Sequence, residues 1–391
     1  MKLRLGVIFG GESVEHEVSI ISAVQAMKNL DEEKYEIIPI YIGKDREWYT
    51  GRLLKDIEVF SDLDLLKRYS TNVILSNKGD KFVLIKKKGI RRIIDYIDLV
   101  LPVVHGTNVE DGTLQGYLEL LGIPYVGSNV YSAAIGQDKV FQKQILDASG
   151  IPVTKYTWFY DSEYKEDEDE VLKKIKSIGY PVMVKPARLG SSVGISKVKS
   201  EKDVKDAIEE AIKYDEKVLI EKVVENLVEV NCSVLGNYEY QEASVLEAVM
   251  GADEFLSYRD KYLGGSKKTG SKGMASTNRV LPARLDDKLT EEVREMSKNV
   301  FKVLNASGVI RIDYLIDKKT KKVYVNETNT IPGSLSFYLW EATNKEYKVL
   351  LDDMISLAIK AYKRKKRKVF SFESNILSNF NGMKGSKGKL K

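Results

Sequence analysis

The sequence is poor in cysteine and has no long apolar run. A single cysteine, Cys232, among 391 residues excludes an internal disulfide framework and is typical of a reducing compartment. Cys232 lies in the apolar run VEVNCSVLG, which favours a buried thiol over a nucleophile. No segment is apolar for long enough to predict a signal peptide or a membrane span. We therefore expect a cytoplasmic protein without stable membrane insertion.

Two nucleotide-binding signatures are also missing. The chain has no GxxxxGK[ST] motif, which excludes a P-loop protein, and the first turn, GGESVEHEVS, lacks the GxGxxG spacing of dinucleotide-binding enzymes. Acidic residues are scarce only at the C-terminal end, where residues 363–391 contain ten Lys/Arg and one Glu and carry a charge of +9. Because the whole chain carries +5, the remaining residues carry about −4. This acidic body argues against a nucleic-acid partner. The run KRKKRK could contact anionic lipid or nucleic acid, although such a run is more commonly a solvated helix end.

The length predicts two or three domains. Strands alternate with helices over residues 1–128, which indicates an α/β unit with a doubly wound parallel sheet, and IDLVLPVVHG is apolar enough for the middle of that sheet. We expect a central domain over 129–222, a C-terminal domain over 223–366 and a basic, disordered tail over 367–391.

A predicted hairpin, GVIRIDYLID–KKTKK–VYVNETN, carries the chemistry of the C-terminal domain. Alternation with period two places Arg311 and Asp313 on one face, and Val325, Glu327 and Asn329 together on one face. Two carboxylates and an amide oxygen suit Mg²⁺ bound together with nucleotide phosphates. A solvated hairpin face is the alternative interpretation.

The segment PVMVKPARLGSSVGISKV predicts a strand, a flexible loop and a second strand. Lys185 precedes the loop, whose glycines and serines can wrap a phosphate with backbone N–H groups. An ordinary turn is the alternative. Lys139 is a second candidate cation. Glu221, Lys222 and Val224 end a predicted strand whose backbone could bind an adenine edge, and Glu229 could accept from ribose hydroxyls.

Residues 255–283 form a long Gly/Ser/Lys loop with Lys261 and Tyr262 at its base, which predicts a closing lid or, alternatively, an unstructured surface loop. In the first domain, GGESVEHEVS and VVHGTNVEDGTLQG both follow strands, where an open α/β sheet binds its ligands. Glu15, His105, Glu110 and Asp111 are therefore candidates to face a polar substrate, although a structural role for His105 is nearly as plausible.

Taken together, GGESVEHEVS, HGTNVEDGTLQG, KPARLGSSVGISK, the DKY of the lid, RID and NETNTIPG resemble the D-alanine–D-alanine ligases of the ATP-grasp superfamily. The resemblance runs from about Met1 to Lys365. It implies central and C-terminal α+β domains that sandwich ATP, a cytoplasmic homodimer, and synthesis of D-alanyl-D-alanine for peptidoglycan through an acyl phosphate.

The resemblance also implies roles for individual residues. Glu15 binds the ammonium of the first D-alanine, and Ser191 and Tyr262 link to Glu15 and close the lid. Lys139, Lys185 and Lys261 hold phosphates. Asp313, Glu327 and Asn329 hold two Mg²⁺ ions, with Mn²⁺ as an alternative, while Arg311 and the Gly333 amide stabilise the oxyanion.

Two departures from the family pattern concern the acceptor and one loop. Tyr338, followed by Leu339, stands where the family has a hydroxyl residue that receives the carboxylate of the second substrate, and Val109 stands where glycine is typical. A relative that joins D-alanine or another amino acid to a different acceptor is therefore an alternative. A nucleotide sensor without ligase activity is disfavoured, because it has no need of a metal set together with an oxyanion donor.

Overall fold

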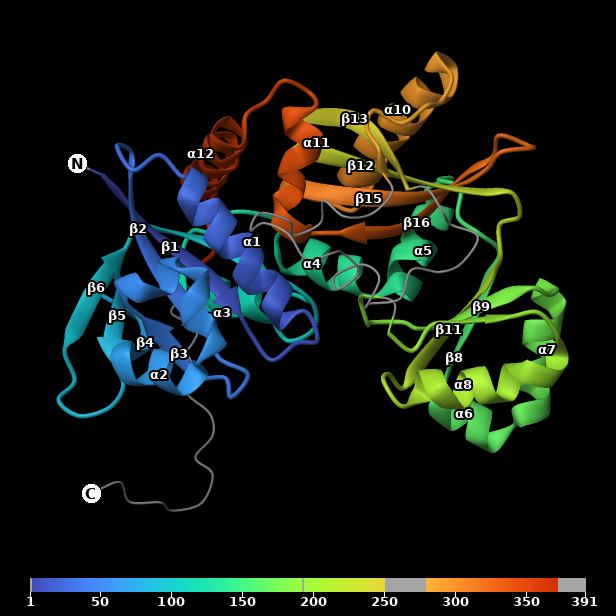
Figure 1. Cartoon of the computed structure of the whole chain (residues 1–391), viewed down its shortest axis with the longest axis horizontal. Helices are drawn as coiled ribbons and strands as arrows, with labels where there is room; N and C mark the ends of the chain where they lie inside the picture. Colours follow the sequence, from blue (N-terminus) through green and yellow to red (C-terminus); the bar gives the residue numbers. More distant parts are fainter. Residues whose placement is uncertain (1, 192, 250–278, 372–391) are drawn as a thin grey trace, which may run out of the picture.

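The computed structural model describes residues 2–191, 193–249 and 279–371, which form three sheets (Figure 1). The expected lid, with Lys261 and Tyr262, lies outside the described residues, as does most of the expected tail. None of the helices in these three ranges is long and apolar enough to cross a bilayer.

The N-terminal sheet has seven strands in the order β6-β5-β4-β3-β2-β1-β7. Its buried, nearly continuous apolar strands β1 and β7 pack against α1, whose buried face is rich in Ala, Val and Ile. The elements are β1 (Leu3–Gly10), α1 (His16–Asn29), β2 (Tyr35–Ile42), β3 (Trp48–Thr50), α2 (Leu63–Tyr69), β4 (Thr71–Lys78), β5 (Lys81–Lys86), β6 (Ile93–Ile97), β7 (Leu99–Val104) and α3 (Thr113–Leu121).

Two expectations for this sheet are wrong. Only the β1–β2 and β1–β7 pairs are parallel, whereas β2 to β6 pair antiparallel, so the sheet is mixed. The strand in IDLVLPVVHG, β7, is the end strand rather than a middle one, and its outer edge meets only an isolated parallel bridge between Val100 and Tyr125 in the described part of the chain. Its apolar sequence reflects burial on both faces and not a central position.

The other two sheets are antiparallel and supply the rest of the site. The four-stranded sheet, β10-β9-β11-β8, is covered by α6, α7 and α8, and the five-stranded sheet, β14-β13-β12-β15-β16, packs on α10. Helices α4 and α5 lie between the sheets in Figure 1. The elements are α4 (Val130–Gln137), α5 (Lys139–Ala148), β8 (Tyr156–Tyr160), α6 (Asp161–Glu166), α7 (Glu168–Ile178), β9 (Val182–Pro186), β10 (Ser196–Val198), α8 (Val204–Ile212), β11 (Lys217–Lys222), β12 (Leu227–Gly236), β13 (Gln241–Val249), β14 (Arg279–Val280), α10 (Asp287–Val303), β15 (Gly308–Asp317), β16 (Val323–Asn329), α11 (Phe337–Glu341) and α12 (Tyr347–Lys365).

Candidate active site

The β15–β16 hairpin forms as expected, but one extra residue changes which side chains share a face. Arg311 pairs with Asn329 and Asp313 with Glu327, after which the register shifts so that Tyr314 pairs with Val325. The expectation that Val325 shares a face with Glu327 and Asn329 is therefore wrong, because the bulge at Asn326 interrupts the period of two. Val325 is fully buried in the core of the sheet, whereas Glu327 and Asn329 line a cavity.

Charges on this hairpin are paired with one another. The Arg311 guanidinium donates two hydrogen bonds to Asp313, 2.6 Å to Oδ1 and 2.8 Å to Oδ2. The Asn329 amide donates to the same carboxylate at 3.3 Å. Burial alone would lower the pKa of Arg311, but the adjacent Asp313 carboxylate outweighs it and raises that pKa. Arg311 is thus a permanent cation, with Asp313 beside it.

The loop after β9 contacts the first helix of the N-terminal sheet. The Ser191 hydroxyl donates a hydrogen bond to the carboxylate of Glu15, which precedes α1. Ser191 has a φ of +58°, in the left-handed region that residues other than glycine rarely adopt. A Cβ on Gly190 would lie 2.8 Å from Glu15 Oε2, so glycine lets the Glu15 carboxylate approach the loop without being displaced. The fold thus brings together Glu15 and Ser191, which are 176 residues apart in the sequence.

Behind this loop lies a buried group of cations and one carboxylate. Glu221 is 2% exposed, and its two oxygens meet Lys143 Nζ at 2.6 Å and Lys185 Nζ at 2.5 Å. Burial alone would raise the pKa of Glu221, but the two ammonium groups hold it below its usual range. Lys185 also donates to Asn326 Oδ1 at 3.2 Å, so the bulge residue orients this lysine. Lys139 donates to the Leu189 carbonyl at 2.8 Å and lies 3.7 Å from Glu327.

Two buried titratable groups come from the loop after β7. Burial raises the pKa of Glu110 to about 7, and the nearby Glu15 carboxylate acts in the same direction. Glu110 accepts hydrogen bonds from the backbone N–H of Gly106 at 3.0 Å and of Ile331 at 2.9 Å. Burial lowers the pKa of His105 to about 4, so its imidazole is neutral at pH 7. The loop is thereby fastened to the segment that follows β16.

Most of these elements border one small cavity of about 70 Å³, whose lining does not include Lys143, Lys185 or Glu221. Its walls are polar and come from α1, the loop after β7, α4, α5, the loop after β9, and the β15–β16 hairpin. Of the residues predicted from the sequence, it collects Glu15, His105, Glu110, Lys139, Ser191, Arg311, Glu327, Asn329 and Gly333.

Known proteins share both the sequence and the arrangement. A model described as "D-ala D-ala ligase N-terminus" matches residues 4–128, and one described as "D-ala D-ala ligase C-terminus" matches residues 145–356. A D-alanine–D-alanine ligase of Thermosipho melanesiensis is 42% identical over 377 residues, covering 96% of this chain and 98% of its own. One from Caldicellulosiruptor bescii is 43% identical, covering 95% and 99%.

The chain belongs to the D-alanine–D-alanine ligase family. Solved structures agree: the ligase of Coxiella burnetii superposes with a TM-score of 0.78 at 30% identity, covering 94% of this chain and 96% of its own. The VanG D-Ala:D-Ser ligase of Enterococcus faecalis superposes with a TM-score of 0.76 at 32% identity, covering 92% and 100%. The expected ATP-grasp fold and the assignment to an ATP-dependent ligase family are confirmed.

Several of the site residues that were predicted from the sequence lie outside the cavity. Asp313 adjoins it through Arg311 and Asn329. The Glu221 side chain is held by two lysines, and Lys222 Nζ donates to the carbonyls of Gly179 and Tyr180 at 3.0 and 2.7 Å. Val224 follows β11, and Glu229 lies on β12.

Tyr338 and Leu339 also lie outside the cavity. The Tyr338 hydroxyl donates to Glu247 Oε2 at 3.0 Å and accepts from Arg279 at 3.0 Å. Burial raises the pKa of Tyr338 to about 12, and Glu247 adds to the shift. Leu339 is fully buried. Tyr338 therefore belongs to a polar cluster with Arg279 and Glu247 on the five-stranded sheet.

Sequence reasoning missed Lys143, Asn326, Arg279 and Glu247. A helical lysine is usually solvated, so nothing in the sequence distinguishes Lys143, and a bulge such as that at Asn326 leaves no reliable signal. Glu247 is a charged residue within the apolar strand-like run ASVLEAVM, which was an available clue. Asp111, a candidate for substrate contact, instead accepts from the backbone of Asn108 and Thr113 at the start of α3.

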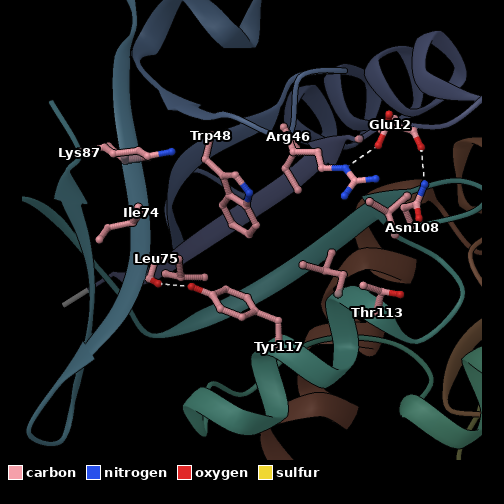
Figure 2. A pocket seen from close by; sticks show the side chains of 14 residues that line it. Glu12, Arg46, Trp48, Ile74, Leu75, Lys87, Asn108, Thr113 and Tyr117 are labelled. Carbon is pink, nitrogen blue, oxygen red and sulfur yellow. Dashed lines mark hydrogen bonds and ion pairs between the residues drawn. The ribbon is translucent and has the colours of Figure 1, made fainter.

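A second hollow, of about 450 Å³, is larger (Figure 2). Like the small cavity, it is lined in part by the loop after β1 and the loop after β7. We name it the Trp48 pocket. Trp48 and Tyr117 meet edge to face at 5.8 Å, and Arg46 pairs with Glu12 at the rim. Val109, the residue that departs from the family glycine, fills the space next to Gly11, where a Cβ would lie 2.6 Å from its Cγ1. Other lining residues are Ile42, Val73, Ile74, Leu75, Lys87, Asn108, Thr113 and Leu114.

Proposed function

We propose that the chain joins two D-alanines to D-alanyl-D-alanine at the expense of ATP. The supporting observation is the small cavity in which the Glu15 carboxylate meets Ser191 of the β9 loop, Lys139 of α5, and Arg311 and Glu327 of the hairpin. In the first step the γ-phosphoryl group of ATP moves to a carboxylate oxygen of the first D-alanine, leaving ADP. In the second, the amine of the next D-alanine attacks the acyl carbon, loses a proton and expels phosphate.

The first D-alanine binds with its ammonium group at Glu15. The hydrogen bond from Ser191 orients that carboxylate, and it ties the β9 loop to the bound amino acid. Glu110, with its pKa near 7, remains partly neutral, which leaves the charge of Glu15 dominant at the ammonium subsite. We assign Tyr262 to the same link through the lid.

Cations of the β9 region receive the nucleotide phosphates. Lys185 is buried and held by Glu221, so it is pre-positioned as a point charge, while Lys139 already donates to the backbone of the same loop. Lys261 completes this set from the lid. We place the adenine against the backbone of Glu221, Lys222 and Val224 and the ribose at Glu229. Glu221 and Lys222 end β11, which pairs with the strand β9 that leads into the phosphate loop; Val224 follows β11, and Glu229 lies on β12.

Divalent metal fits the donor set on the hairpin. Asp313 and Glu327 are cross-strand partners, and Asn329 follows on the same strand. Two carboxylates and one amide leave coordination positions for phosphate oxygens and water, which is the arrangement Mg²⁺ prefers. We propose two Mg²⁺ ions, with Mn²⁺ as a substitute. The metal supplies charge neutralisation for the transferred phosphoryl group.

Arg311 and the Gly333 backbone N–H stabilise the oxyanion of the tetrahedral intermediate. Both border the cavity. Because Arg311 is largely buried, solvent screens the attraction between its guanidinium group and an oxyanion less than it would at the surface. The homodimer and the cytoplasmic location stay predictions, and a mass measurement by light scattering tests the first.

The experiment measures phosphate release and dipeptide formation with Mg²⁺-ATP, with and without D-alanine. D-alanine-dependent release with equal dipeptide supports the proposal, and ATP binding without release in the presence of D-alanine contradicts it.

A different acceptor is the second candidate, and the position of Tyr338 favours it. Its hydroxyl is engaged with Glu247 and Arg279, so it is not free to receive a substrate carboxylate without losing one of these partners. A panel of amino-acid acceptors at saturating ATP and D-alanine separates the two candidates. If dipeptide forms no faster with D-alanine as acceptor than with the other amino acids, the second proposal replaces the first.

A further inference from the structure

The end of α12 and the residues after it carry an unusual concentration of exposed cations. Five of the six consecutive basic residues are exposed, and Arg364 is half-buried. We name residues 363–370 the α12 patch; its members are Lys363, Arg364, Lys365, Lys366, Arg367, Lys368, Val369 and Phe370. This patch contains none of the residues that line the catalytic cavity.

Most of these cations have no carboxylate partner in the part of the chain that the structure describes. Arg364 pairs with Glu239 at 2.5 Å, and Lys365 pairs with Glu119. Within residues 2–191, 193–249 and 279–371, the other four (Lys363, Lys366, Arg367 and Lys368) form no ion pair. Their charge is therefore available to an external anion, while residues 1–362 carry a net negative charge of about −4.

Apolar side chains project to solvent at the same place. Val369 is 82% exposed and Phe370 is 74% exposed. Leu120, 85% exposed, follows Glu119, which the ion pair with Lys365 holds against the helix end. Exposed aliphatic and aromatic side chains beside unpaired cations are the composition of a surface that lies in the headgroup layer of a membrane.

A groove of about 600 Å³ runs beside the patch and combines both features. Tyr125, Tyr238 and Tyr362 form aromatic walls, and Arg364, Lys366 and Lys368 contribute charge. Tyrosine is well suited to the boundary between headgroups and acyl chains because one end of its ring is polar.

We propose that the α12 patch docks the protein peripherally on bilayers that contain anionic phospholipid. The four unpaired cations meet the lipid phosphates, and Val369, Phe370 and Leu120 enter the upper acyl region. The acidic body is repelled by the same surface, so it orients the molecule with the patch toward the lipid. A single-stranded nucleic acid would also bind to cations and stack on aromatic rings, but it would make no favourable contact with the exposed aliphatic side chains of Val369 and Leu120.

The test is sedimentation of the full chain with vesicles of phosphatidylglycerol and phosphatidylcholine, against vesicles of phosphatidylcholine alone. We expect binding only to the anionic vesicles, and loss of binding at high ionic strength. The triple variant K363Q/K366Q/K368Q should lower the partition constant about a hundredfold, at roughly fivefold for each lysine. V369S/F370S should lower it about tenfold through lost apolar burial.

The matched control is K318Q/K319Q/K322Q, which removes three exposed lysines from the β15–β16 turn that make no ion pair in the described part of the chain. Equal losses in the two triple variants would overturn the proposal, because binding would then depend on net charge alone. Wild-type binding by V369S/F370S, together with displacement of the protein from vesicles by polyuridylate, would overturn it in favour of a nucleic-acid surface. Catalysis should be unchanged in all three variants.

Discussion

The catalytic cavity and the Trp48 pocket are lined by residues of the same two loops, yet they differ in almost every physical property. The cavity is about 70 Å³ and polar, and its charged side chains are held by ion pairs and hydrogen bonds. The pocket is about 450 Å³, and its walls are aromatic and aliphatic. Under the function proposed above, the larger hollow is therefore not the site of chemistry. The proposed site is the cavity whose buried charges are positioned by their neighbours, because phosphoryl transfer depends on positioning and on charge neutralisation.

The largest effect should come from the hairpin side of the cavity. Glu327→Gln removes one of the two carboxylates proposed to hold metal, and we expect turnover to fall about a thousandfold or more with the fold retained. Steady-state rates at several Mg²⁺ concentrations, together with a thermal unfolding curve, measure both parts. Lys319→Gln in the turn of the same hairpin is the control and should be active. Turnover by Glu327→Gln close to the wild-type rate would remove Glu327 from the metal site.

The contact between Ser191 and Glu15 should have the next largest effect. Ser191→Ala deletes the hydroxyl that orients the carboxylate, and we expect kcat/KM for the first D-alanine to fall about a hundredfold. Ser191→Gly is the matched variant, since glycine also lacks the hydroxyl but accepts the φ of +58° without strain. Equal losses in both variants assign the effect to the hydrogen bond. Recovery of activity in the glycine variant would assign it to the backbone instead.

Tyr338 tests whether the acceptor subsite extends beyond the cavity. We expect Tyr338→Ser to change the ratio of rates with D-alanine and other acceptors about tenfold, because it removes bulk as well as the bonds to Glu247 and Arg279. Tyr338→Phe keeps the ring and should change the ratio less. An acceptor panel measures both, and an unchanged ratio in the serine variant would place Tyr338 outside the acceptor subsite.

Sequence reasoning succeeded where a side chain follows directly from a strand or loop and failed where backbone irregularity or distant pairing decides. The hairpin that carries Arg311, Asp313 and Asn329 and the loop after β9 that carries Ser191 could be found from alternation and glycine content. Phosphate binding by that loop stays a prediction. The bulge at Asn326 could not, because an added residue preserves composition while changing the face. The pairing of Lys143 with Glu221 spans 78 positions along the chain, and the burial that makes it strong exists only after folding.

The antiparallel extension of the N-terminal sheet shows the same limit. Strand β3 has only three residues, and β4, β5 and β6 mix apolar residues with polar or charged ones, so their sequences do not show how they pair. The long apolar strands β1 and β2 were evident. The expectation of a parallel sheet extended the pattern of those strands to their neighbours. One wall of the Trp48 pocket, with Trp48, Val73, Ile74 and Leu75, belongs to this extension, and nothing in the sequence predicted it.

Glu110 couples the cavity to stability and to pH. Its pKa of about 7 in the folded protein exceeds the ordinary value of 4.5, so folding favours the protonated form. The contribution is therefore fully present below pH 4.5 and is lost as the pH rises through 7, by about 3 kcal/mol of unfolding free energy. Glu110→Gln should remove this decline. Denaturant unfolding between pH 5 and pH 8 measures it, and identical pH dependence in the two proteins would contradict the raised pKa.

The smallest effect on catalysis should come from the Trp48 pocket. Trp48→Ala removes an indole that packs edge to face on Tyr117 at 5.8 Å, and we expect a loss of about 2 kcal/mol of stability, since the residue is only half-buried. Ligase rates below the unfolding temperature should stay within about twofold of wild type, because the polar groups of the cavity are held by hydrogen bonds that do not pass through Trp48. Denaturant unfolding and initial rates measure the two quantities. A loss of rate as large as that of Ser191→Ala would show that packing in the pocket affects the positions of Glu15 and Glu110 through the shared loops. The two hollows would then differ in composition but not in their importance for catalysis.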